Sequence, residues 1–120
     1  MSEAVRKVQQ GDVEWKTLPG GLRFKFLGVG AKFITAIGVA EPGGGETWHK
    51  HGPEFEETYY VLKGKGKLCW IEHGEEHTVE FQEGDCLYLD FGVENMFVNT
   101  GKEELWMLFS ISNVAVMRVE

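Results

Sequence analysis

The stretch GGGETWHKHGPEFEETYYVLKG, residues 43–64, contains two histidines and a carboxylate at a spacing that predicts a metal site. His49 and His51 are two residues apart on a segment expected to be extended, so their side chains project to one face of a strand. Glu57 follows a Gly-Pro turn and can fold back onto them. Two imidazoles and one carboxylate on one wall form a facial triad, which binds a first-row divalent metal and leaves coordination positions open. The stretch therefore predicts a site that can take a substrate, without identifying that substrate.

Length and composition predict one domain over residues 1–120. A chain of 120 residues with eight Phe and four Trp can bury a single hydrophobic core unaided. Cys69 and Cys86 are too few for a disulfide framework, and neither belongs to a CxxC pair. The N-terminal residues lack the apolar centre of a signal peptide, and no run approaches the ~18 apolar residues of a membrane span. We therefore expect a cytoplasmic protein that does not enter a membrane.

The charge is unevenly distributed along the chain. Residues 1–45 carry six basic and four acidic side chains, residues 46–100 carry four and twelve, and the last twenty carry two and three, which gives the net charge of −7. A nucleic acid partner is not expected, because phosphate binding needs a basic surface. The acidic excess in the middle of the chain favours cations near the metal motif, or it is a solvated surface that keeps a small domain in solution.

The whole chain shows a β pattern of short apolar or alternating segments separated by turns. Leu18–Gly21 places Pro and then Gly where a type II turn requires them, and a Pro-Gly-Gly-Gly run follows residue 41. A hairpin is expected at residues 73–76. Short strands with turns every 8–12 residues indicate a sandwich or barrel. The predicted strands are 22–26, 32–40, 58–62, 67–72, 78–81, 86–89, 96–99, 105–111 and 114–119.

Residues 43–64 resemble the first motif of the cupin family, which has a Gly, an HxH pair, a Glu and a closing Gly. The interval between His51 and Glu57 is five residues, one or two longer than in the family, whereas Glu56 has the ordinary spacing. We assign Glu57, because only this residue keeps the six-residue interval to Gly64.

Residues 84–99 resemble the second cupin motif in register, although two positions differ. Asp90 stands where the family has Pro, and Asn95 stands where the family has its fourth metal ligand, His. Asn99, the last residue of the motif, is retained. The resemblance covers roughly residues 35–111.

The resemblance implies an all-β fold with little or no helix, a double-stranded β-helix or jelly-roll barrel. It also implies one divalent transition metal inside the barrel, of the group Fe, Mn, Zn, Ni or Co. An amide oxygen is a weak ligand beside imidazole, so the site is either a set of four with Asn95 or a bare facial triad. A third possibility is a pocket without metal that binds its ligand by hydrogen bonds. The implied metal ligands are His49, His51, Glu57 and Asn95.

Tyr59 is the candidate catalytic residue. It lies two residues after Glu57, so the strand alternation points it into the same cavity. There it could act as a proton donor or base towards a metal-bound substrate, and some cupin lyases are similar in placing a tyrosine at this interval. The alternative is that Tyr59 fills the barrel.

The fold does not fix the chemistry, because cupins include dioxygenases, lyases, isomerases and binding modules. The first hypothesis is a metal-dependent enzyme that acts on a small polar molecule, a hydroxy acid, keto acid or sugar derivative, with dioxygenase or lyase chemistry. A non-catalytic module that binds or senses a small ligand is the second. The third is a metal-free sugar isomerase or epimerase.

We also expect a homodimer. The resemblance to small single-domain cupins implies a homodimer, because these proteins often form one. Residues 114–119 are also predicted to form an apolar strand that follows a closed barrel. A free apolar edge is prone to aggregation unless a second copy, or the barrel itself, covers it.

Overall fold

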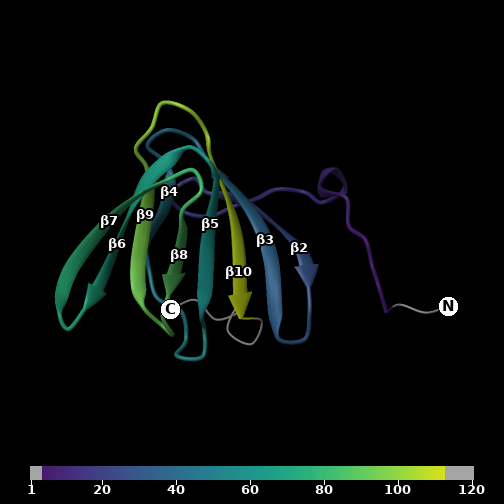
Figure 1. Ribbon diagram of the computed structural model, residues 1–120, viewed down its shortest axis with the longest axis horizontal. Coiled ribbons are helices and arrows are strands. Elements are labelled where there is room, and N and C mark those ends of the chain that lie inside the picture. Colours follow the sequence, from purple (N-terminus) through teal and green to yellow (C-terminus); the bar gives the residue numbers. More distant parts are fainter. Residues whose placement is uncertain (1–3, 113–120) are drawn as a thin grey trace.

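The computed structural model describes residues 4–112 and shows two antiparallel sheets that face each other (Figure 1). The six-stranded sheet has the order β1-β2-β3-β10-β5-β8, and the four-stranded sheet has the order β4-β9-β6-β7. The predicted all-β barrel is confirmed. Within residues 4–112 the only helical turn is the 3-10 turn η1 (Gln10–Asp12). The strands are β1 (Lys16–Thr17), β2 (Arg23–Val29), β3 (Phe33–Ala40), β4 (Gly45–His49), β5 (Glu57–Lys63), β6 (Lys65–Glu72), β7 (Glu75–Gln82), β8 (Cys86–Leu89), β9 (Glu94–Asn99) and β10 (Leu105–Ser112).

Eight of the nine predicted strands match strands of the structure, with ends that shift by a few residues; the ninth, 114–119, lies outside the described residues. The predicted hairpin joins β6 to β7 through His73 and Gly74, whose φ values of 55° and 76° are those of a tight two-residue turn. The type II turn is also present, because Gly20 has φ 99° and the Gly21 N–H donates to Leu18 O over 3.0 Å. The strands β1 and β4 were not among the predicted ranges.

The core lies between the inner faces of the two sheets. Period-two alternation places Tyr59 and Val61 of β5 inwards, while Tyr60 and Leu62 stay exposed on the outer face. The Tyr59 ring meets Phe97 of β9 and Phe109 of β10 edge to face. These contacts join the four-stranded sheet to the six-stranded one, and fix the inner wall of β5 on which the predicted carboxylate ligand lies.

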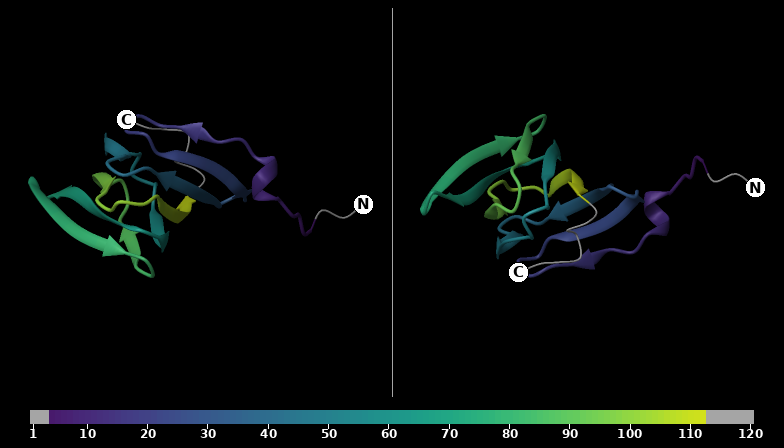
Figure 2. Two further views of the ribbon diagram at one scale, coloured as in Figure 1. Left: turned by 90° about the horizontal axis from the view of Figure 1, so that it is seen from above. Right: turned by 90° about the horizontal axis from the view of Figure 1, so that it is seen from below.

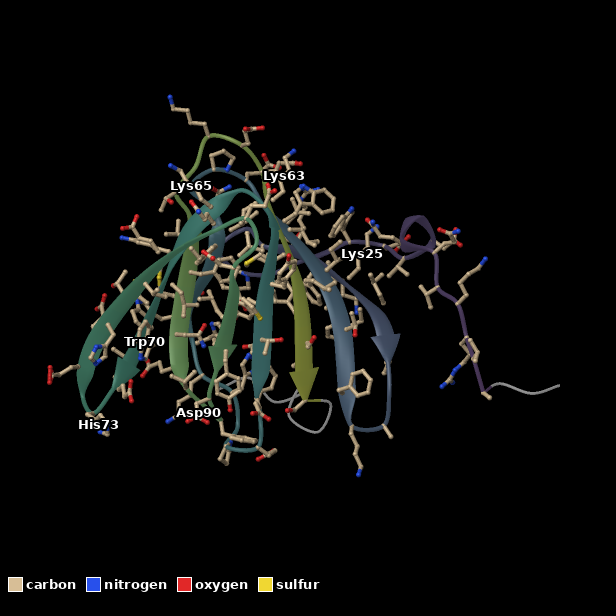
Figure 3. All side chains as sticks on the ribbon, viewed as in Figure 1. Lys25, Lys63, Lys65, Trp70, His73 and Asp90 are labelled. Atoms are coloured by element: carbon tan, nitrogen blue, oxygen red, sulfur yellow. The ribbon has the colours of Figure 1, made fainter. Side chains whose placement is uncertain are left out.

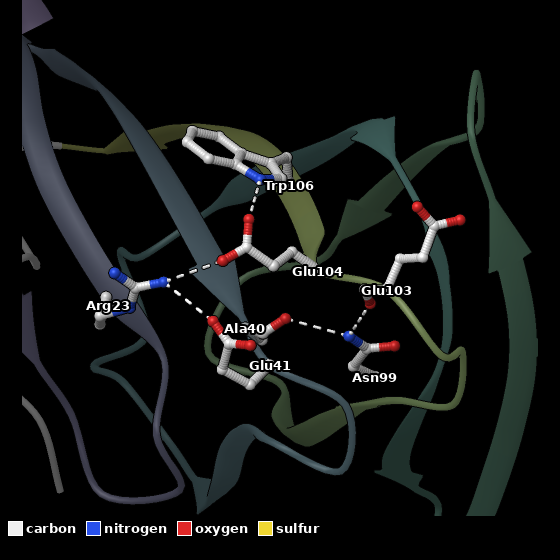
Figure 4. Close-up of polar contacts among 7 residues, drawn as sticks. All are labelled: Arg23, Ala40, Glu41, Asn99, Glu103, Glu104 and Trp106. Carbon is white, nitrogen blue, oxygen red and sulfur yellow. Dashed lines mark hydrogen bonds and ion pairs between the residues drawn. The ribbon is translucent and has the colours of Figure 1, made fainter.

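Asn99, the last residue of the second motif, connects the end of β3 to the loop before β10 (Figure 4). Its Nδ2 donates to Ala40 O over 3.0 Å and to Glu103 O over 2.8 Å, and its Oδ1 accepts from Gly101 N–H over 2.8 Å. Because both the nitrogen and the oxygen of this buried amide are hydrogen-bonded, Asn99 holds the loop without leaving a polar atom unpaired. The residue that the motif retains is therefore structural in this chain.

The N-terminal segment covers part of the outer face of β2. Alternation predicts a solvated Lys25, but Lys25 is buried, and its Nζ donates to Gln10 O over 2.9 Å and lies 4.3 Å from the Trp15 ring centre (Figure 3). Trp15 in turn meets Trp106 edge to face. The period-two alternation of β2 is as predicted. Lys25 is buried because the N-terminal segment with Gln10 and Trp15 covers it. Residues 4–9 extend away from the barrel (Figure 2).

No helix within residues 4–112 is long and apolar enough to cross a membrane. The apolar segment 114–119, on which the expectation of a covered edge rested, is outside the described residues.

Gly45 marks a place where β4 and β9 approach too closely for any side chain. A Cβ atom at Gly45 would lie 2.0 Å from Phe97 O, a backbone atom that cannot move alone. We expect Gly45→Ala to lower the free energy of unfolding by about 3 kcal/mol or more, measured by urea denaturation. Gly11→Ala is the matched control, since nothing lies within 4 Å of a Cβ there. Equal stabilities of the two variants would show that β4 does not pack against β9 in this way.

Candidate metal centre

A β-bulge in β4 creates the local geometry of the site. Glu46 pairs with Phe97 and His49 pairs with Asn95, so three steps along β4 match two steps along β9. Residues three apart on a regular strand face opposite sides, but one extra residue restores the same side. The bulge therefore places Glu46 and His49 together on the inner face, where strict alternation would have separated them.

The His49 ring is held with one nitrogen available. Its Nδ1 lies 2.9 Å from Thr47 O, a contact in which only the ring can donate. A neutral ring that donates from Nδ1 carries its lone pair on Nε2. Nε2 is buried without a hydrogen-bond partner and lies 3.6 Å from Glu46 Oε2. This arrangement, with one nitrogen fixed by a carbonyl and the other open, is that of a metal-ligating histidine.

His51 lies beyond the end of β4 and is positioned by ring contacts. Its ring stacks on Phe55 with centres 3.7 Å apart, and the two histidine rings are 4.9 Å apart at 77°. The prediction that His49 and His51 lie on a single strand is wrong, since β4 ends at His49. The two rings are neighbours nevertheless.

Glu57 is the buried member of the two adjacent glutamates. It is 6% exposed at the start of β5, and its Oε1 accepts from Tyr59 over 3.3 Å. Glu56 instead accepts from Tyr88, and its main chain bonds Ser112. The spacing to Gly64 had selected the same residue.

Tyr59 is completely buried, and its hydroxyl lies between two carboxylates. The hydroxyl is 3.3 Å from Glu57 Oε1 and 3.4 Å from Glu46 Oε1. Burial, followed by the charges of these carboxylates, raises the pKa of Tyr59 well above its usual range. Tyr59 therefore holds its proton and serves as a donor. It is not among the residues that line the two cavities described below.

Asn95 faces the same interior. It pairs directly with His49 across the sheet, so the two side chains lie on the same face. Asn95 is 1% exposed; its Nδ2 donates to Val93 O over 3.1 Å, and its Oδ1 has no hydrogen-bond partner. An amide oxygen left unpaired in a buried place is costly unless something binds it.

Two cavities meet at Glu46 and His51. One, of about 120 Å³, enters the barrel and is also lined by Glu57, and the other, of about 240 Å³, opens beside His49. Of the residues that the structure describes, no Lys or Arg lines either cavity. The remaining walls of the inner cavity are apolar: Leu18, Leu22, Phe24, Phe26, Ala36, Phe55, Phe109 and Ile111.

Sequence reasoning missed Glu46. It precedes the HxH pair, and period-two alternation gives it the wrong side of the strand relative to His49. The run of glycines at residues 43–45 was the only signal that the strand is irregular here.

The chemistry of the donor atoms fits a divalent metal, but the distances between the side chains are too long to enclose one. Imidazole nitrogens and carboxylates suit first-row divalent ions, and Nε2 of His49 and Oδ1 of Asn95 are buried atoms without a hydrogen-bond partner in the described part of the chain. Within residues 4–112, however, no group of three His, Cys, Asp or Glu side chains stands close enough to hold an ion as placed. The set of His49, His51, Glu57 and Asn95 therefore stays a prediction.

Comparison with known proteins gives a consistent result. A family described as "Cupin domain" matches residues 37–111. The oxalate-binding protein of Thermotoga maritima is 36% identical over 67 residues, which are 56% of this chain and 51% of that protein, so the match spans about half the length of this curated relative.

Two solved structures share the fold. KdgF from a Halomonas species has a TM-score of 0.75 at 14% identity, over 92% of this chain and 94% of that one. A protein from Thermotoga maritima described as a predicted oxalate decarboxylase has a TM-score of 0.72 at 24% identity, over 89% and 98%.

The buried carboxylates predict an unusual pH dependence of stability. Burial, and then the neighbouring Glu46, raises the pKa of Glu57 well above 4.5, and burial also raises the pKa of Glu46. The folded state then holds these protons more tightly than the unfolded chain, so their contribution is complete below about pH 4.5 and is lost as the pH rises through the raised values. With chelator present, we expect a higher melting temperature at pH 5 than at pH 8. Glu57→Gln should reduce that difference.

Glu80→Gln is the control, because Glu80 is an exposed residue of β7. If Glu57→Gln and Glu80→Gln leave the same pH dependence, Glu57 is not held in an apolar environment.

Proposed function

From the premise that this chain belongs to the cupin domain family, we propose a function for its candidate site. We propose that the chain holds one divalent transition metal through His49, His51 and Glu57. We propose further that it acts on a small molecule bound beside that ion. The observation that carries the proposal is the His49 ring, whose Nδ1 is fixed by Thr47 O, while the buried Nε2 faces Glu46 Oε2 at 3.6 Å and has no hydrogen-bond partner within residues 4–112. Burial of such a nitrogen is costly unless it binds something.

The bound metal would act as a Lewis acid towards an oxygen of the substrate. The side chains of the protein would position the ligands of this metal. Phe55 holds the His51 ring by stacking, and Tyr59 keeps its proton and donates it towards Glu57 or Glu46. We assign Tyr59 a positioning role, since it is fully buried and does not line the cavities.

The inner cavity favours a substrate with one polar end and an apolar body. Eight of its eleven lining residues are apolar, and the polar ones, Glu46, His51 and Glu57, lie together. Sugar hydroxyls would lose their water there and find few partners. Among the expected classes, a hydroxy or keto acid with a short carbon chain fits better than a sugar, provided that the metal supplies the positive charge for its carboxylate.

Oxalate, which lacks the apolar body that the inner cavity favours, is tested as a separate candidate ligand, since the curated relative is an oxalate-binding protein. For the reaction we propose metal-dependent dioxygenase or lyase chemistry on an acid of this class. A module that binds its ligand without turnover is the alternative to be separated by experiment.

We further propose a homodimer through the outer face of the six-stranded sheet. This face exposes apolar side chains that are 40–61% accessible to solvent, and a second copy would cover them. They are Phe33, Tyr60, Leu62 and Tyr88.

The metal proposal is tested by binding. We expect the purified protein, saturated and then passed through a desalting column, to retain about one equivalent of metal by elemental analysis. His49→Ala should weaken binding by about a hundredfold or more, because loss of supporting contacts alone costs 10- to 100-fold. His77→Ala is the control, since this exposed histidine stacks on Trp70 away from the site.

Failure of the unmodified protein to bind any divalent metal would contradict the proposal. Turnover of oxalate and of short hydroxy and keto acids by the metal-loaded protein then separates enzyme from binding module: binding without product formation would favour the module.

For the homodimer, we expect light scattering at low micromolar concentration to give twice the chain mass. Tyr60→Glu should give monomers, because it places a charge on the apolar face, whereas Glu80→Gln should not. A monomer before substitution would refute the interface.

A further inference from the structure

The strongest unassigned feature of the site is Glu46, which neither the motif nor the spacing had identified. Its carboxylate lies close to an imidazole nitrogen of the candidate site, with Oε2 3.6 Å from His49 Nε2. Two atoms bound to one ion at about 2.1 Å lie roughly 3.0 to 3.4 Å apart at tetrahedral or octahedral angles. The measured separation exceeds this range by only a few tenths of an ångström.

The backbone holds this pair together. The β-bulge puts Glu46 and His49 on one face of the sheet, so the backbone itself brings the two side chains close together. Both side chains are largely buried, with 14% and 11% of their surface exposed. The second carboxylate oxygen of Glu46 is held 3.4 Å from the Tyr59 hydroxyl, which leaves Oε2 directed at the histidine.

An independent observation points to a ligand at the same place. Asn95, 1% exposed and paired with His49 across the sheet, has an Oδ1 without a hydrogen-bond partner. Its face of the sheet is also that of Glu46. Within residues 4–112, His49 Nε2 thus lacks a hydrogen bond beside the Glu46 carboxylate, and Asn95 Oδ1 lacks one on the same face of the sheet.

The balance of charge favours a second carboxylate. One carboxylate would leave a divalent ion with a net charge of +1 in a barrel whose inner cavity has mostly apolar walls and no Lys or Arg. Two carboxylates and two neutral imidazoles leave no net charge, which lowers the cost of burying the ion. Asn95 is neutral and cannot make this contribution.

We propose that Glu46 is a metal ligand, so that the site is formed by two histidines and two glutamates, with Asn95 beside it. This inference rests on the proposed metal site. In this set Glu46 takes the place of the histidine that the second motif lacks at Asn95. The donors come from β4, the segment after it and β5, and none need come from β9.

Co²⁺ alone is the probe. Titration calorimetry should show that Glu46→Gln weakens Co²⁺ binding at least about tenfold, with a shift in the visible d–d bands. Glu80→Gln removes an exposed charge and should leave affinity and spectrum unchanged. Circular dichroism checks that each variant is folded, and Glu46→Asp, which keeps the charge, replaces Glu46→Gln if that variant does not fold.

Glu46→Cys gives a direct readout. A thiolate bound to Co²⁺ produces an intense charge-transfer band in the near ultraviolet, which we expect in this variant and not in the unmodified protein, although the latter contains Cys69 and Cys86. The band reports ligation independently of any activity.

The outcomes separate the two proposals. If the unmodified protein binds Co²⁺ while Glu46→Gln keeps its affinity and Glu46→Cys shows no band, Glu46 is not a ligand and the metal site of the proposed function stands. If Asn95→Ala weakens binding and Glu46→Gln does not, the amide is the fourth donor and the inference is wrong. If the unmodified protein binds no Co²⁺ or other divalent ion, the proposed function itself fails.

Discussion

The extra residue in β4 is the constraint on which the site depends. A regular strand would turn Glu46 away from His49, and the barrel interior would then hold one fewer carboxylate near the imidazoles. Just before the bulge, Gly45 lets β4 approach β9 within a distance that no Cβ could occupy. Tight pairing on one side of the bulge and re-aimed side chains on the other are two results of the same backbone feature. The fold and the chemistry are coupled at this point.

Regular elements of this fold can be predicted from local pattern, whereas the site depends on departures from that pattern. Alternation along a straight strand predicts β5. The interval to Gly64 in the first motif selects Glu57, which is buried, over Glu56. Glu46 could not be found in this way, since a bulge changes the period. Lys25 could not either, because the segment that buries it lies ten or more residues earlier in the chain.

The barrel combines an apolar cavity with buried acidic groups, and this combination narrows the chemistry. Tyr59 has one proton to donate and two carboxylates within reach. Within residues 4–112, no Lys or Arg lines the two cavities, so positive charge would have to come with what is bound. The proposed metal would supply that charge for an anionic or polar group. In the proposed site, Glu46 would supply the donor that the second motif lacks at Asn95, together with a negative charge that neither a neutral imidazole nor an amide carries.

The strand β7 forms one edge of the four-stranded sheet, and nearly all of its residues are exposed. Such an edge offers unpaired N–H and C=O groups to any other extended chain. Here the edge carries Glu75, Glu76 and Glu80, so a second copy that approached edge to edge would bring like charges together. The acidic middle of the sequence thus limits how these molecules can associate in a crowded solution, because growth of the sheet from molecule to molecule is opposed at the strand where it would begin.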